Sequence, residues 1–105
     1  MANQSSALLA LGDPTRLAIV ERLVERPRAV VDLARELPVT RPAVSQHLRI
    51  LKDAGLVIDE RAGNRRIYRV DPEALATLRD HLGRFWEKAL AAYKTTAEQI
   101  NEEEK

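Results

Sequence analysis

The sequence predicts a small, mainly α-helical domain that carries one β-hairpin, and three observations support this. Apolar residues recur three and four apart through most of the chain, which is the period of amphipathic helices. The pattern changes to alternation only within residues 56–70, on either side of Gly63-Asn64. The chain has 105 residues, which is the size of a single domain. The expected order is helix, helix, short strand, helix, helix, strand, strand, helix.

Two helices are expected within residues 5–25. The first is a short apolar segment, residues 5–11, which Gly12 ends. The second opens at Asp13-Pro14, an N-cap residue followed by proline at the first helical position. Its apolar side chains keep the helical period as far as Glu25, where Arg26-Pro27-Arg28 breaks the pattern.

A short strand and two further helices follow. The β-prone run Ala29-Val30-Val31 predicts a brief edge strand, and Asp32 lies near the start of a helix that ends around Leu37. Residues 38–40 make a tight turn, and Thr40 is a good N-cap for the next helix, which Gly55 ends as its C-cap. Two helices joined by about three residues are typical of a helix-turn-helix.

Residues 56–70 predict a hairpin of two strands. Gly63 and Asn64 supply the positive φ angles that a tight hairpin turn needs. Asp71-Pro72 repeats the capping signal of Asp13-Pro14 and opens a long helix to residue 100, after which a frayed tail is expected. A helix-turn-helix followed by a hairpin predicts a winged helix-turn-helix in one domain, residues 1–105. Residues 38–55 would form its turn and recognition helix, and residues 56–70 its wing.

The charges are distributed unevenly along the chain. Residues 1–70 hold 12 Lys and Arg against 8 Asp and Glu, a net of +4, whereas residues 71–105 hold 5 against 8, a net of −3. Residues 41–69 alone carry 7 basic and 3 acidic side chains, which accounts for the whole excess. Such an asymmetry favours a surface that meets a polyanion.

The helix that begins after Thr40 has two different faces. Val44, Leu48 and Leu51 fall within roughly 60° of one another and predict a buried stripe. The other side carries hydrogen-bond donors that suit the DNA major groove, where Arg can bond guanine, Gln adenine, and Ser or Thr a base or a phosphate. The DNA-contacting residues expected here are Thr40, Arg41, Pro42, Ser45, Gln46, Arg49 and Lys52. His47 lies at the border of the stripe, and it would either reach DNA or hold the two helices of the motif together.

The hairpin predicts a second contact with DNA. A tip that contains glycine lets the backbone approach a phosphate, and arginine can bind phosphate or enter a narrow minor groove. The expected contacts are Arg61, Asn64, Arg65 and Arg66, with Arg69 beside them.

Double-stranded operator DNA is therefore the expected partner, and a protein-interaction module on the same scaffold is the alternative. An enzyme is not expected, because Ser45 and His47 point about 200° apart and no other nucleophile has a base.

The chain resembles the ArsR/SmtB family of bacterial winged-helix repressors. The residues that carry this resemblance are LGDPTRLAIVERL, DLARELPVTRPAVSQHLRILKDAGLV and RAGNRRIYRVDP, over roughly Ala7 to Tyr93. The resemblance implies a homodimer that binds palindromic operator DNA and represses its own operon. It also implies pairing through the first and last helices, residues 5–11 and 72–100. The interface residues expected from it are Leu8, Leu9, Leu11, Leu78, Leu82, Phe85, Trp86, Leu90 and Tyr93.

The last helix has two apolar rows. Leu75, Leu78, Leu82, Phe85 and Ala89 form one, and Trp86, Leu90, Tyr93, Ala97 and Ile100 form the other. We expect one row to pack on the domain and the other to meet the partner.

The usual metal sites of the family are not expected. Where many members place thiolates, this chain has Ala29-Val30-Val31-Asp32-Leu33, and it contains no cysteine. The second family site, on the last helix, fails in its spacing, because Asp80 and His81 are adjacent and Ala92 stands where a ligand is needed. We therefore expect no metal and no cofactor. The resemblance is to the non-metal branch of the family, whose members respond to other signals or to none known, and the inducer stays open.

The segment MANQSSALLALGDPTR has no cationic start before its apolar run, so no signal peptide is expected. No apolar run approaches the ~20 residues of a membrane span. The sequence therefore predicts a cytoplasmic protein.

Overall fold

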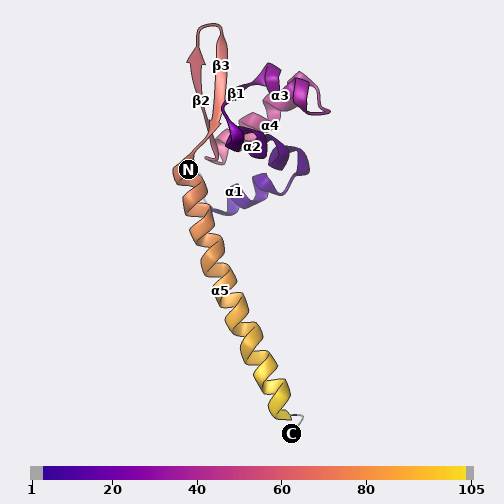
Figure 1. The fold of residues 1–105 in the computed structure, drawn as a ribbon, viewed down its shortest axis with the longest axis vertical. Coiled ribbons are helices and arrows are strands. Elements are labelled where there is room, and N and C mark those ends of the chain that lie inside the picture. The colour runs from indigo at the N-terminus through magenta and orange to yellow at the C-terminus, as the bar shows by residue number, and fades with distance from the viewer. Residues whose placement is uncertain (1–3, 104–105) are drawn as a thin grey trace.

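The structure, a computed structural model, describes residues 4–103 and consists of a small helical body, a hairpin and one projecting helix (Figure 1). The fold is mainly α with a small three-stranded antiparallel sheet, as the sequence predicts. In chain order its elements are α1 (Gln4–Leu11), α2 (Pro14–Glu25), β1 (Arg28–Ala29), α3 (Val30–Glu36), α4 (Arg41–Asp53), β2 (Val57–Ala62), β3 (Arg65–Val70) and α5 (Pro72–Glu103).

The helix ends are set by the capping residues that the sequence indicates. The Asp13 carboxylate accepts hydrogen bonds from the backbone N–H groups of Thr15 (2.8 Å) and Arg16 (3.0 Å) at the start of α2. Asp71 does the same for Glu73 (3.0 Å) at the start of α5. These bonds satisfy N–H groups that have no partner inside the helix, so each Asp-Pro pair determines where its helix begins.

The fourth helix, α4, is closed at both ends. Thr40 Oγ1 accepts from the backbone N–H of Ala43 at 3.3 Å. At the other end Gly55 adopts a φ of 80°, its N–H bonds the Lys52 carbonyl (2.9 Å), and the next N–H bonds the Leu51 carbonyl (3.0 Å). This is a Schellman motif with Gly55 one position beyond the C-cap, which is Ala54.

The strand expected at Ala29-Val30-Val31 is shifted and shorter. β1 covers only Arg28 and Ala29, and α3 already begins at Val30. The reason is a cap, because the Asp32 carboxylate accepts from the Ala29 backbone N–H at 3.1 Å and turns the chain into the helix. The strand is an edge strand, since the sheet order is β1-β3-β2.

Strands β2 and β3 form the hairpin that the sequence predicts, paired from Val57 with Val70 to Ala62 with Arg65. The turn differs in one respect from the expectation. Gly63 has a φ of 63°, but no described residue other than glycine has a positive φ, so Asn64 does not share that conformation. Glycine at the first central position, followed by a residue of negative φ, is the pattern of a type II′ turn.

The core lies between α2, α3 and α4 and the base of the sheet. Its fully buried side chains come from all of these elements: Ile19, Leu23, Leu33, Val44, Leu48, Leu51, Leu56 and Val57. α1 adds Ala7 and Ala10, and α5 adds Leu78. The helix-turn-helix, α3 and α4, is thus held from behind by α2, which leaves one side of α4 and the hairpin free.

Helix α5 leaves this body and continues alone (Figure 1). The radius of gyration is 18.8 Å, against about 13 Å for a compact chain of this length. Every residue from 83 to 103 except Ala97 is exposed. The frayed tail expected from residue 101 is wrong for residues 101–103, which are helical, and residues 104 and 105 lie outside the described residues.

The apolar residues of α5 form one stripe and not two separate rows. At about 100° per residue, the ten residues of the two expected rows, from Leu75 to Ile100, fall within one side of the helix. Leu75, Leu78 and Leu82 pack against the core, whereas Phe85 and the apolar residues beyond it are mostly bare. The expected division, one row for the core and one for a partner, is therefore wrong, because the stripe is divided along its length. Within residues 4–103 no helix is long and apolar enough to span a membrane.

Candidate nucleic-acid interface

The amphipathic character predicted for α4 is present in the structure. Val44, Leu48 and Leu51 are completely buried on one side. On the other side the structure exposes Thr40, Arg41, Pro42, Ser45, Gln46, Arg49 and Lys52. Among the described residues, no ion pair involves Arg41 or Arg49. Their guanidinium groups therefore remain available to a ligand outside the chain.

His47 faces inside the domain. Its Nδ1 lies 3.4 Å from a guanidinium nitrogen of Arg16 on α2, and that arginine also donates from Nε to the Ala10 carbonyl at 2.8 Å. Because arginine can only donate, a hydrogen bond here requires the His47 tautomer whose Nδ1 carries no proton. This contact lies inside the domain, but it joins α4 to α2 and not to α3, so it differs from the expected bond between the two helices of the motif.

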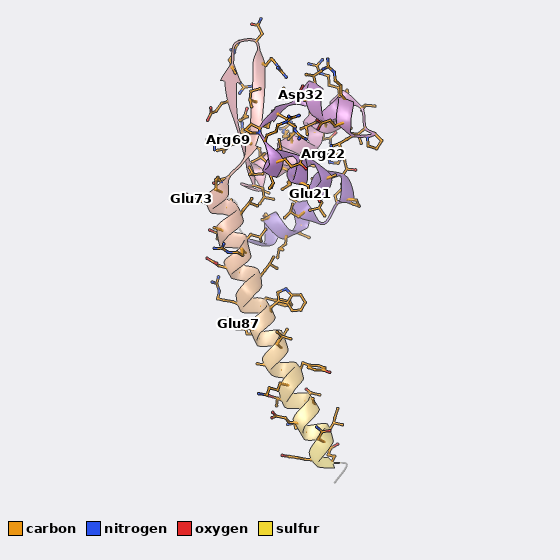
Figure 2. All side chains as sticks on the ribbon, viewed as in Figure 1. Glu21, Arg22, Asp32, Arg69, Glu73 and Glu87 are labelled. Atoms are coloured by element: carbon orange, nitrogen blue, oxygen red, sulfur yellow. The ribbon has the colours of Figure 1, made fainter. Side chains whose placement is uncertain are left out.

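The arginines of the hairpin are paired with acids, which the sequence does not show. Arg65 bonds Asp32 of α3 at 2.8 Å, Arg66 bonds Asp59 of β2 at 2.8 Å, and Arg69 bonds Glu60 at 3.1 Å. Lys52 of α4 also bonds Asp59, at 2.8 Å. Figure 2 shows Asp32 on the helical body and Arg69 on the hairpin, both away from the free part of α5 where Glu87 is labelled.

The positive charge of the hairpin is therefore partly offset by acidic partners. Three of its arginines, Arg65, Arg66 and Arg69, are each joined to a carboxylate. At the tip, Arg61 Nε donates to the Gly63 carbonyl at 3.4 Å, and among the described residues no ion pair involves Arg61. Arg61 and Asn64 are both exposed at the tip of the wing.

Two of these carboxylates, Asp32 and Asp59, are held in their charged form. The Lys52 ammonium, followed by Arg66, keeps the pKa of Asp59 below its usual value. For Asp32, the bond from the Ala29 backbone N–H is the main cause of a lowered pKa, and Arg65 adds to it. Opposite charges and hydrogen bonds to the ionised form both act in this direction.

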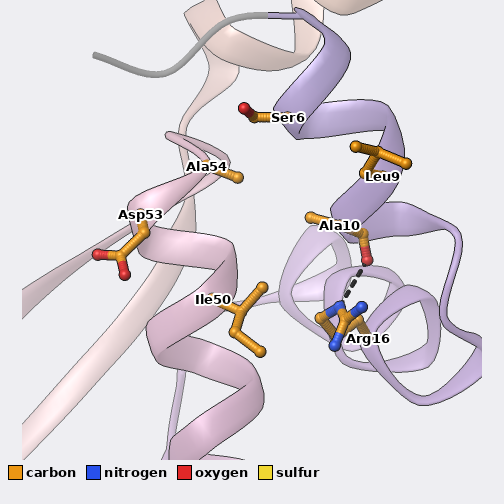
Figure 3. Close-up of a pocket in the computed structure, with 7 residues that line it drawn as sticks. All are labelled: Ser6, Leu9, Ala10, Arg16, Ile50, Asp53 and Ala54. Atoms are coloured by element: carbon orange, nitrogen blue, oxygen red, sulfur yellow. Dashed lines mark hydrogen bonds between the residues drawn. The ribbon is translucent and has the colours of Figure 1, made fainter.

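Two hollows lie on either side of Ile50. One, of about 580 Å³, runs along the exposed side of α4 and is lined by Ser45, Gln46, Arg49, Ile50 and Asp53. The other, of about 320 Å³, lies between α4 and α1 and is lined by Ser6, Leu9, Ala10, Arg16, Ile50, Asp53 and Ala54. Figure 3 shows Ile50 directed toward α1 and the Asp53 carboxylate directed away from it.

Ile50 was not among the residues expected at the interface. It falls between the buried stripe and the polar side of α4, and the structure leaves it partly exposed. An apolar side chain at this place can contact a thymine methyl group. The signal that could have found it is its spacing of four residues from Gln46, which places the two side chains on neighbouring parts of the helix surface.

The residues expected to contact a second copy divide into two groups. Leu8, Leu9, Phe85, Trp86, Leu90 and Tyr93 are exposed large apolar side chains. Leu11 and Leu82 are partly buried against the core, and Leu78 is only 5% exposed within it. Leu78 is thus a core residue of the protomer, because its place on α5 faces the body.

Comparison with known proteins identifies the family. The family described as bacterial regulatory protein, arsR family, matches residues 13–59, from the cap of α2 into β2. The HTH-type transcriptional regulator Rv2034 of Mycobacterium tuberculosis is 62% identical over 84 residues, which are 80% of this chain and 78% of that protein. The chain belongs to the arsR family of bacterial regulatory proteins. This arsR-family chain is therefore a transcriptional regulator with a DNA-binding winged helix-turn-helix, and not an enzyme.

Other relatives agree with this assignment. The HTH-type transcriptional repressor SmtB of Mycobacterium tuberculosis is 49% identical over 69 residues, which are 66% of this arsR-family chain but about half, 51%, of SmtB. A solved ArsR-like transcriptional regulator from Rhodococcus sp. RHA1 has a TM-score of 0.72 at 33% identity, covering 90% of this chain and 92% of its own. The winged helix-turn-helix domain Mb0332 from Mycobacterium bovis, described as homodimeric, has a TM-score of 0.66 at 30% identity, with 82% and 80% covered.

The positions expected to lack metal ligands lie at the start of α3. Ala29, Val30 and Val31 have no donor atoms in their side chains, and Asp32 is engaged with Ala29 and Arg65. In the part of the chain that the structure describes, no three His, Cys, Asp or Glu side chains gather into a group that could hold a metal ion.

Proposed function

We propose that this arsR-family regulator is a homodimeric repressor that binds palindromic operator DNA, including the operator of its own gene. Residues 38–55 would read the major groove, residues 56–70 would act as the wing, and residues 5–11 and 72–100 would form the dimer. The single observation that carries the proposal is α4, whose apolar side is wholly buried while its donor-rich side is exposed.

The donors on α4 are placed along the face that a major groove would meet. Arg41, Ser45, Gln46 and Arg49 lie on the exposed side, and the first three lie in its N-terminal half. In helix-turn-helix proteins that half carries most base contacts. Thr40 and Pro42 would approach the backbone at the helix start. His47 has a supporting role in this proposal, because it contacts Arg16 inside the domain.

The wing would contact the DNA backbone. Arg61 and Asn64 stand at its tip, and Arg65 and Arg66 behind them keep exposed donors although each bonds a carboxylate. Arginine has five N–H donors, so one bond to an acid leaves others for a phosphate. Lys52 would join them at the base of the wing.

The bare stripe of α5 supports a dimer. Phe85, Trp86, Leu90, Tyr93 and Ile100 expose half or more of their surface on one side of a helix that touches nothing else over this length. Contiguous apolar surface of this kind marks an interaction site. A second copy is the occupant we propose, with Leu8 and Leu9 of α1 at its edge, and a related domain from Mycobacterium bovis is described as homodimeric. Two-fold pairing would place two recognition helices about one DNA turn, ~34 Å, apart.

The repressing role rests on relatives and on the proposed DNA contacts. SmtB of Mycobacterium tuberculosis is named a repressor. A dimer bound across a promoter would block transcription from it. We further propose that the releasing signal is not a metal held by the start of α3 or by α5, because the side chains at the start of α3 offer no thiolate and no cysteine occurs in the chain.

Binding to the region upstream of the regulator's own gene tests the proposal. We expect a footprint of two half-sites and an affinity at least about 10³-fold above that for random DNA, falling steeply with salt. Arg49→Ala should weaken upstream binding by about 1–3 kcal/mol, while Arg35→Ala, a truncation of an exposed arginine on α3, serves as the matched control. Equal affinity for upstream and random DNA would contradict a sequence-specific repressor and would favour a protein-interaction module.

The same assay tests the signal. The footprinting is repeated with zinc, nickel, arsenite and a panel of small molecules. We expect the footprint to stay unchanged when zinc, nickel or arsenite is added. Release of the DNA by any one metal would contradict the proposal of a non-metal inducer.

A further inference from the structure

Asp59 lies where the end of α4 meets the wing. Its two carboxylate oxygens bond different cations: Oδ1 bonds the Lys52 ammonium at 2.8 Å, and Oδ2 bonds the Arg66 guanidinium at 2.8 Å. Lys52 belongs to the last turn of α4 and Arg66 to β3. One carboxylate thus joins the recognition helix to the hairpin, and we call Lys52, Asp59 and Arg66 the Asp59 cluster.

The exposures within the Asp59 cluster are unequal. The Asp59 side chain is only 7% exposed, whereas those of Lys52 and Arg66 are 53% and 57% exposed. The acid is therefore covered, with both oxygens occupied, while the two cations above it keep donors that face solvent. The neighbouring Glu60 differs in both respects, because its side chain is 68% exposed and it bonds only Arg69.

Free Lys and Arg side chains sample many rotamers, and fixing them on a phosphate costs conformational entropy. A covered carboxylate that already holds both cations removes much of this loss before DNA arrives. It also fixes the wing relative to α4, because the bonds connect two elements. The cations then stand close together on the surface proposed to meet the DNA backbone.

We propose that Asp59 is a positioning residue for DNA binding, which presents Lys52 and Arg66 together to the phosphate backbone without touching DNA itself. This inference rests on the DNA contacts of the proposed function. It assigns a favourable role to an acid on a surface that binds a polyanion. If Asp59 acted only through its charge, its removal would strengthen DNA binding.

The test compares two substitutions that change the formal net charge equally. Asp59→Asn and Glu60→Gln each raise it from +1 to +2 at neighbouring positions of β2. Affinity is measured for a random duplex and for the upstream duplex across a series of salt concentrations. We expect Asp59→Asn to weaken binding to the random duplex by roughly tenfold and to lower the salt slope by about one to two, since each lost phosphate contact changes it by ~0.9. Glu60→Gln should bind as tightly as the unsubstituted protein or more tightly.

A second pair of variants keeps every charge and leaves Asp59 in place. Arg66→Lys removes the fork of donors that can meet Asp59 and a phosphate at once, and Arg69→Lys makes the same change next to Glu60. We expect weaker binding for Arg66→Lys only. If the thermal melt shows that Asp59→Asn does not fold, unchanged binding by Arg66→Lys still overturns the role of Asp59.

The outcomes separate the two proposals. Unchanged or tighter binding of the random duplex by folded Asp59→Asn, or unchanged binding by Arg66→Lys, overturns the role of Asp59. Equal affinity of the unsubstituted protein for both duplexes overturns sequence-specific repression, while the random duplex still decides the role of Asp59. No binding of either duplex at low salt overturns both.

Discussion

Trp86→Ala tests whether the bare stripe of α5 forms the proposed dimer. A tryptophan side chain covers about 150–250 Å² when it is buried, and Trp86 is 59% exposed in the protomer, so a partner can cover roughly 100 Å² of it. At ~25 cal/mol per Å² this stabilises the dimer by about 2.5 kcal/mol for each copy. Because a two-fold interface loses the contact twice, the dimer dissociation constant should rise about 10³- to 10⁴-fold.

Sedimentation equilibrium over a range of protein concentrations measures this constant. Lys88→Ala is the matched control, because Lys88 lies on the same exposed length of α5 but about 200° around the helix from Trp86. We expect its dissociation constant to stay within about threefold of that of the unsubstituted protein. A change of less than tenfold for Trp86→Ala, or the same change for Lys88→Ala, would show that the stripe does not carry the dimer.

Three further predictions concern the body of the domain. Gly55→Ala should lower the unfolding free energy by about 1–2 kcal/mol in a urea titration, because Gly55 has a φ of 80°. Gly83→Ala is the comparison, because it adds the same methyl group where φ is not positive and no atom lies within 4 Å. An unchanged urea midpoint for Gly55→Ala would contradict the capping role. His47→Ala should lower the unfolding free energy by about 1 kcal/mol through loss of the Arg16 contact. The ratio of the affinity for upstream DNA to the affinity for random DNA should stay the same. A changed ratio with unchanged stability would instead indicate a base contact. The pKa of Asp13, Asp32 and Asp59 lies below the ordinary ~3.9 in the folded protein, so the stability that these charged carboxylates contribute is complete above that pH and is lost as pH falls through the lower folded values. The urea midpoint should therefore be level from about pH 7 to 5 and fall toward pH 3. A rise of the midpoint toward pH 3 would contradict these pairings.

The local signals of the sequence determine much of this fold. Asp13-Pro14, Thr40 and Asp71-Pro72 begin helices where the sequence predicts, since a cap acts through bonds to residues two or three positions away. Val44, Leu48 and Leu51 are buried as their spacing indicates. These features depend on neighbours in the chain, so they can be inferred without the tertiary structure.

The features that the sequence could not show are those that depend on distant residues. Arg65 meets Asp32 across 33 positions, and His47 meets Arg16 across 31. The charge of the wing and the role of His47 therefore depended on contacts that no spacing rule supplies. The division of the α5 stripe is a similar case, because only the tertiary structure shows that the body covers the stripe as far as Leu82.

The position of Leu78 in the core also has a consequence for the geometry of an assembled dimer. Leu78 fixes the rotational phase of α5 about its own axis, because its side chain is held by the body. The bare length of the same stripe must then face in one fixed direction. In a dimer joined by that length, this direction would set the separation of the two α4 helices and so the spacing of half-sites. In such a dimer a change of core packing around Leu78 would alter which half-site spacings fit, although Leu78 belongs neither to α4 nor to the hairpin.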